Sequence, residues 1–120
     1  MTYQDIVEHY IRAVNWGLKY GSFRRALELF TDDVVLTVGE MRRTGKEAVL
    51  DYLKGIVAQS VTALVETPHP ERIRFRFKRN YPQSDWSEYD SVIIFLSEDR
   101  KKITEMQVRE KAPSTVYWGG

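Results

Sequence analysis

Apolar side chains recur with helical spacing at the start of the chain. They stand three or four residues apart at Ile6, Val7, Tyr10, Ile11, Val14 and Leu18, a pattern typical of an amphipathic helix. Thr2 and Asp5 supply an N-cap and an acidic first turn, and Gly21 can end the helix in a left-handed conformation. Ser22 predicts the cap of a second, short helix that continues to Phe30. We therefore expect a helical hairpin here.

A strand and a third helix follow. The β-branched segment 34–38 predicts a strand that ends at Gly39. Thr44 and Glu47 have the spacing of a capping box, which predicts the start of a helix. Its apolar positions keep helical spacing over about three turns, at Val49, Leu50, Leu53, Ile56 and Val57. A helix of that length can cover one side of a sheet.

From Ser60 onward the hydrophobic period changes from helical spacing to two. The alternation predicts strands over 61–66, 72–78, 86–96 and 103–111, joined mostly as hairpins. The second half of the 86–96 strand is apolar on both faces, which indicates a central position in the sheet. Helices first and strands afterwards predict an α+β fold, with three N-terminal helices packed on one face of a curved, mainly antiparallel sheet.

Composition narrows the class of protein. The 120 residues, 42% of them hydrophobic, predict a single domain over 1–120 with a real core. A net charge of +1 provides no overall field toward nucleic acid or membrane, so neither is expected as a partner. The longest apolar run, 92–96, is too short to span a bilayer, and no secretion signal is visible. The absence of cysteine removes disulfides and thiolate metal sites, and we expect a cytoplasmic protein.

Two motifs in the first half of the chain are similar to a known family. The segment 26–35, ALELFTDDVV, is followed by the turn 44–49, TGKEAV, and then by Tyr52 and Leu53. This order resembles SnoaL-like proteins of the NTF2-like superfamily, in which a helix ends in Leu-Phe, an acidic pair starts a strand and a Gly-Lys-Glu-Ala-like turn opens the next helix. The resemblance extends over nearly the whole chain. Its motifs are structural rather than catalytic.

The resemblance implies a cone-shaped half-barrel, commonly dimeric, whose helices and concave sheet face enclose an apolar pocket. Members include isomerases, polyketide cyclases, dehydratases, epoxide hydrolases and noncatalytic binding domains. We therefore expect a small, largely apolar molecule as ligand, a homodimer, and no cofactor or metal. The residues expected to line the pocket are Trp16, Val38, Glu40, Tyr52, Phe75, Phe77, Val92, Met106 and Val108.

Tyr10 is the candidate hydrogen-bond donor of such a pocket. It matches the position at which the ketosteroid isomerase branch places a phenol that stabilises a developing oxyanion. The other two catalytic groups of that branch do not carry over, since the base matches Val38 and its acid partner falls near Val92 or Ile93. The same isomerisation is therefore not expected. We favour the simpler interpretation that Tyr10 is a core tyrosine.

Asp90 and Glu110 are the candidate catalytic carboxylates. Asp90 shares the parity of Val92, and Glu110 shares the parity of Met106 and Val108. If those apolar side chains face the pocket, both carboxylates do too, and desolvation would make them fit to move protons.

A hairpin shifted by one residue gives the opposite result. It sets Asp90 across from Arg76 and Glu88 across from Lys78, on an exposed face of ion pairs that contribute little energy. The sequence does not fix the register, and we favour the exposed one.

The remaining patterns predict no further site. His9 and His69 have no partners for a metal ion or a catalytic triad. A basic strand carries Arg72, Arg74, Arg76, Lys78 and Arg79, interleaved with Phe75 and Phe77. Since its cations and its aromatics fall on opposite faces, RNA binding is not expected. Two hypotheses stay open: a pocket that binds or converts a small apolar molecule, and a noncatalytic domain whose sheet binds a second copy or another protein.

Overall fold

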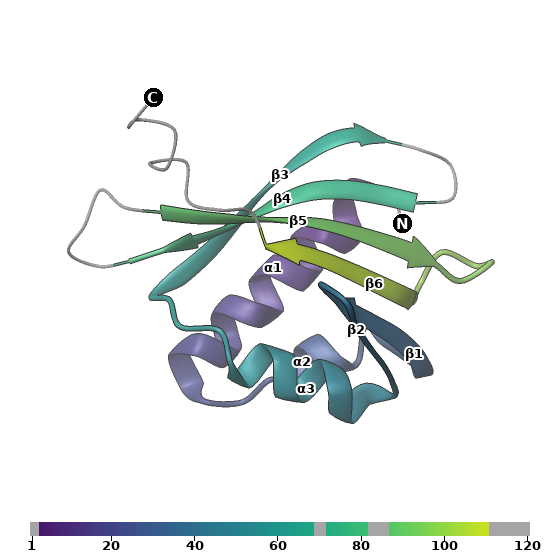
Figure 1. The fold of residues 1–120 in the computed structure, drawn as a ribbon, viewed down its shortest axis with the longest axis horizontal. Coiled ribbons are helices and arrows are strands. Elements are labelled where there is room, and N and C mark those ends of the chain that lie inside the picture. Colours follow the sequence, from purple (N-terminus) through teal and green to yellow (C-terminus); the bar gives the residue numbers. More distant parts are fainter. Residues whose placement is uncertain (1–2, 69–71, 82–86, 111–120) are drawn as a thin grey trace.

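The structure, a computed structural model, describes residues 3–68, 72–81 and 87–110 (Figure 1). Its helices are α1 (Tyr3–Tyr20), α2 (Arg24–Leu27) and α3 (Lys46–Lys54), and its strands are β1 (Phe30–Val38), β2 (Met41–Thr44), β3 (Ser60–Pro68), β4 (Arg72–Asn80), β5 (Ser87–Leu96) and β6 (Ile103–Glu110). The three helices pack on one face of a curved, unclosed sheet, so the predicted α+β fold class is confirmed. The N-cap expected at Thr2 lies outside the described residues.

The six strands form one sheet in the order β2-β1-β6-β5-β4-β3. All neighbours are antiparallel except β1 and β6, which run parallel. β5 lies inside the sheet, as its apolar second half predicts. β2 and β3 are the two edge strands.

The core lies between the helices and the concave face of the sheet. α1 contributes its predicted apolar stripe, in which Ile6 and Val14 are fully buried. β4, β5 and β6 contribute alternate residues, and these are also buried: Ile73, Phe75, Phe77, Val92, Ile94, Met106 and Val108. α1 packs along β3, while α3 packs against β1.

The register of the β4–β5 hairpin decides which residues reach this core. Phe77 pairs with Asp90 and Arg79 pairs with Glu88, so the exposed register that we favoured is wrong. The shifted register would set Val92 beside the outward-facing Arg74. Burial of the apolar face selects the observed pairing.

Three local predictions at helix starts and ends are corrected. The N-cap of α2 is Phe23 rather than Ser22, and it has no side-chain cap. Thr44 is the last residue of β2, where it pairs with Val35, and the N-cap of α3 is Gly45, which has no side-chain cap. The predicted capping box is therefore wrong, because Thr44 pairs within the sheet instead of capping the helix. Phe30, expected to end the second helix, instead begins β1 opposite Ile103 of β6. Gly21 ends α1 at φ 79°, as predicted.

No helix within the described residues is long and apolar enough to cross a membrane.

Candidate functional site

Asp90 is the one buried charged side chain among the described residues. It lies on the core side of β5 with 3% of its surface exposed. Its Oδ1 accepts a hydrogen bond of 3.0 Å from Nη2 of Arg79. A carboxylate buried on an apolar sheet face is costly without such a partner, because burial removes its hydration.

Arg79 joins two carboxylates at this end of the sheet. Its Nη2 lies 3.0 Å from Oδ1 of Asp90 and 3.0 Å from Oε2 of Glu88. Its Nε is buried and has no hydrogen-bond partner among the described residues. The prediction that Arg79 lies with the outward cations of its strand is therefore wrong. Alternation along the strand predicts the core side for Arg79, since it shares the parity of Phe75 and Phe77.

Tyr10 is both a core residue and a neighbour of Asp90. It is 1% exposed, and its ring lies 6.0 to 6.3 Å from the rings of Phe30, Phe75 and Phe77. Burial raises the pKa of its hydroxyl far above the usual value, and the negative charge of Asp90 raises it further. Tyr10 therefore stays a neutral phenol, which can donate a hydrogen bond.

Tyr81 extends this group of polar side chains. Partial burial raises the pKa of its hydroxyl, and the charge of Glu88 and a hydrogen bond to that carboxylate act in the same direction. We call Tyr10, Arg79, Tyr81, Glu88 and Asp90 the polar cluster. The two carboxylates of the cluster share the single guanidinium of Arg79.

The predicted pocket residues divide into two groups. Five of them are buried in the core, on β4, β5 and β6: Phe75, Phe77, Val92, Met106 and Val108. The backbone of Glu110 pairs with that of Asp90, but its side chain lies outside the described residues.

The other four predicted residues lie elsewhere. Val38 and Tyr52 line an open groove of about 250 Å³ between β1, β2 and α3. Glu40 is exposed in the β1–β2 turn, because Gly39 at φ 61° ends the strand and its alternation. Trp16 is 37% exposed on the outer side of α1, where the Arg25 guanidinium lies 3.8 Å from its ring centroid.

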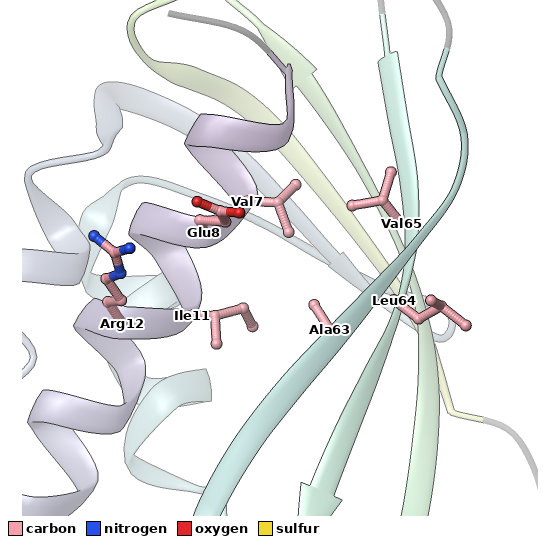
Figure 2. A pocket seen from close by; sticks show the side chains of 7 residues that line it. All are labelled: Val7, Glu8, Ile11, Arg12, Ala63, Leu64 and Val65. Atoms are coloured by element: carbon pink, nitrogen blue, oxygen red, sulfur yellow. The ribbon is translucent and has the colours of Figure 1, made fainter.

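A groove that the sequence did not indicate lies between α1 and β3 (Figure 2). Its volume is about 340 Å³, and it is lined by Val7, Glu8, Ile11, Arg12, Ala63, Leu64 and Val65. Figure 2 shows Val7 and Ile11 directed toward β3, with Ala63 and Val65 directed back toward the helix. Only the fold brings these two segments together.

Metal ligation has no support in the described part of the chain. No group of three His, Asp or Glu side chains there could hold a metal ion. His9 is exposed on α1, and His69 lies outside the described residues.

Comparison with known proteins identifies the fold. No family model matches the sequence, and no curated protein matches it. A de novo designed protein with a curved β-sheet is similar over 92% of this chain and 88% of its own, with a TM-score of 0.70 and 17% identity. An NTF2-like protein of unknown function from Cytophaga hutchinsonii is similar over 100% of this chain and 96% of its own, with a TM-score of 0.64 and 14% identity.

A second natural protein gives the same result. An NTF2-like protein of unknown function from Exiguobacterium is similar over 88% of this chain and 98% of its own, with a TM-score of 0.66 and 12% identity. The chain therefore has the NTF2-like fold that its first half predicted. A designed sequence adopts a similar fold, so function has to be argued from the site rather than from the fold.

Proposed function

We propose that this protein binds a small, largely apolar carbonyl compound between its helices and the concave face of its sheet, with Asp90 and Tyr10 as the reacting and orienting groups. The observation that carries the proposal is the position of Asp90, a carboxylate 3% exposed on an otherwise apolar sheet face beside a buried phenol. Ligand sites are typically apolar surfaces with a few convergent polar groups.

The charge states of the two groups suit proton transfer. The Arg79 guanidinium at 3.0 Å favours the ionised carboxylate of Asp90, which can accept a proton. Tyr10 is protonated at neutral pH and can donate a hydrogen bond to an oxygen that gains negative charge. The proposed chemistry requires Asp90 as the ionised base and Tyr10 as the protonated donor.

The proposed step is an isomerisation next to a carbonyl group. Asp90 takes a proton from the carbon beside the carbonyl, and the electron pair of the broken C–H bond moves onto the carbonyl oxygen. Tyr10 donates its hydrogen bond to that oxygen. Asp90 then returns the proton to a different carbon of the same molecule, so no atom or electron is gained or lost. Glu110, predicted as a second carboxylate of this site, would lie beside Asp90 through its backbone pairing.

A simple enone tests the proposal without a known substrate. Cyclohexenone, added to the ¹⁵N-labelled protein, is expected to shift the amide resonances of Tyr10, Phe77 and Asp90 selectively. In D₂O the protein is expected to speed exchange of the probe's acidic protons. Tyr10→Phe should slow that exchange by about a hundredfold, the effect of removing one oxyanion donor, and Asp90→Asn should abolish it.

A matched substitution controls for the removal of a carboxylate elsewhere in the chain. Asp51→Asn removes an exposed carboxylate of α3, which pairs with Arg43 of β2 at 3.0 Å, and this variant should leave the exchange rate unchanged. The proposal fails if saturating probe shifts no core resonance. It also fails if the folded Asp90→Asn variant exchanges probe protons as fast as the parent.

A noncatalytic binding domain is the second candidate function. The observation in its favour is the packing of Tyr10 against Phe30, Phe75 and Phe77, which fills the middle of the core with aromatic rings. A domain of that kind needs only its outer surface. Retention of a partner or of a second copy, by a protein that binds no small probe, would favour it over the first candidate.

A further inference from the structure

The middle of β3, residues 62–65, forms an exposed sheet edge without the usual protection against strand pairing, whereas Glu66 and Pro68 lie further along the strand. Natural edge strands carry charges, prolines or bulges that prevent another strand from adding. The opposite edge follows this rule, since β2 carries Arg42 and Arg43. In β3 the segment 62–65 reads Thr-Ala-Leu-Val, without charge or proline, and the irregularity of its pairing with β4 begins only after Val65.

The free backbone groups of this edge can be assigned. At Val61 both groups point away from β4, because its N–H donates to Asn15 Oδ1 at 2.7 Å and its carbonyl accepts from Asn15 Nδ2 at 2.9 Å. Alternate residues of an antiparallel strand point the same way. Ala63 and Val65 therefore each direct an N–H and a carbonyl away from the sheet. Among the residues that the structure describes, Asn15 satisfies the backbone groups of Val61, the first residue of this series.

We infer that this edge docks a second copy of the chain, with the two β3 strands antiparallel about a two-fold axis at Leu64. In this register Ala63 faces the partner's Val65, and Val65 faces the partner's Ala63. The two pairs use all four free backbone groups of each copy, as a closed isologous contact requires. A register centred on Ala63 would leave the groups of Val65 opposite residue 61, which Asn15 already occupies.

The proposed axis also accounts for an exposed apolar side chain. Leu64 is 63% exposed and points away from the α1–β3 groove (Figure 2). At the axis it lies in a non-hydrogen-bonded pair, the position at which opposite side chains of an antiparallel ladder come closest. Each copy would therefore cover Leu64 with the partner's Leu64.

The helix beside the edge has a matching distribution of charge. Glu8 and Arg12 are both exposed, lie one turn apart on α1 and line the same groove as Ala63 and Val65. A two-fold axis sets the α1 helices of the two copies antiparallel. Glu8 then faces the partner's Arg12 while Arg12 faces the partner's Glu8, so like charges are kept apart. This complementarity favours a second copy over an unrelated strand.

Sedimentation across a concentration series tests the inference with the full chain. The interface is small, so we expect a reversible dimer whose share grows with concentration rather than a permanent one. Leu64→Lys places two cations together at the axis and should weaken association by about tenfold or more. The amide protons of Ala63 and Val65 should exchange with solvent more slowly as the fraction of dimer increases.

Met41→Lys is the matched control. Met41 is 68% exposed on β2, at the opposite edge of the same sheet, and this substitution adds the same charge. It should leave the dissociation constant unchanged. A chain that is monomeric up to about 1 mM overturns the inference, as does a dimer that Met41→Lys weakens and Leu64→Lys leaves intact.

Discussion

At the scale of single residues, Asp90 and Arg79 show what alternation along a strand can predict about the position of a side chain. Asp90 was a candidate because it shares the parity of Val92, and the structure buries it on that face. Its partner was missed because Arg79 follows a run of outward cations, although its parity matches that of Phe77. The odd or even position of a residue along its strand predicts only which face of the sheet its side chain lies on. The register that sets Arg79 within 3.0 Å of two carboxylates depends on pairing between strands, which a single sequence does not fix.

Tyr10 makes the free energy of unfolding depend on pH in the alkaline range. Burial and the charge of Asp90 raise its pKa in the folded state, whereas in the unfolded chain it titrates near 10. Above that pH the unfolded state releases a proton that the folded state keeps, so the free energy of unfolding decreases with rising pH. One such group contributes about 1.4 kcal/mol per pH unit. Urea titrations from pH 8 to 11 should therefore show a shallower decline for Tyr10→Phe than for the parent.

A control excludes a general effect of removing a phenol. Tyr20 is 57% exposed at the end of α1, and Tyr20→Phe should leave the alkaline slope of the parent in place. Equal slopes for the parent and Tyr10→Phe would mean that Tyr10 ionises without cost in the folded protein. That result would contradict its burial beside Asp90.

At the scale of elements, types were easier to predict than ends. The apolar stripes of α1 and α3 and the alternation of β4 identify those elements from local pattern alone. The errors fall where a distant strand decides the local structure. Phe30 joins β1 because it pairs with Ile103, and Thr44 joins β2 because it pairs with Val35. Neither partner is visible from the local sequence.

The contact between α1 and α2 reverses the usual effect of removing a helical glycine. Replacing glycine with alanine inside a helix normally stabilises it by about 1 kcal/mol. At Gly17, however, a Cβ would lie 2.2 Å from the ring of Phe23, which is 9% exposed. Gly17→Ala should therefore lower the free energy of unfolding, by about 1 to 3 kcal/mol, as overpacking does. Urea denaturation followed by circular dichroism measures the change.

A double variant identifies the cause of that loss. Phe23→Ala removes the ring, so adding Gly17→Ala to it should cost nothing further or restore some stability. Gly55→Ala, at a helix end where the new Cβ would come no closer than 3.4 Å, serves as the tolerated substitution. Equal losses from Gly17→Ala with and without Phe23 would contradict the proposed clash.

At the scale of the whole molecule, the sheet joins the two halves of the chain. β6, the last described strand, lies between β5 and β1, so the N-terminal strands are held by the C-terminal one. The core is one continuous cluster that includes residues of α1, α3 and all the inner strands. Removing β6 from the sheet would expose both sides of this cluster at once. We therefore expect that neither half remains folded by itself.

This arrangement predicts a single cooperative unfolding unit. Val34 in β1, Phe75 in β4 and Val108 in β6 lie in separate parts of the sheet, and each is at most 1% exposed. Their amide protons should exchange through the same global opening, with free energies that agree within about 1 kcal/mol and decline equally with urea. Native-state hydrogen exchange measures all three in one experiment. If Val34 exchanged several kcal/mol more easily than Phe75 and Val108, then β1, β2 and α3 would form a separate unit. The parallel pairing of β1 with β6 would then not be the contact that unites the fold.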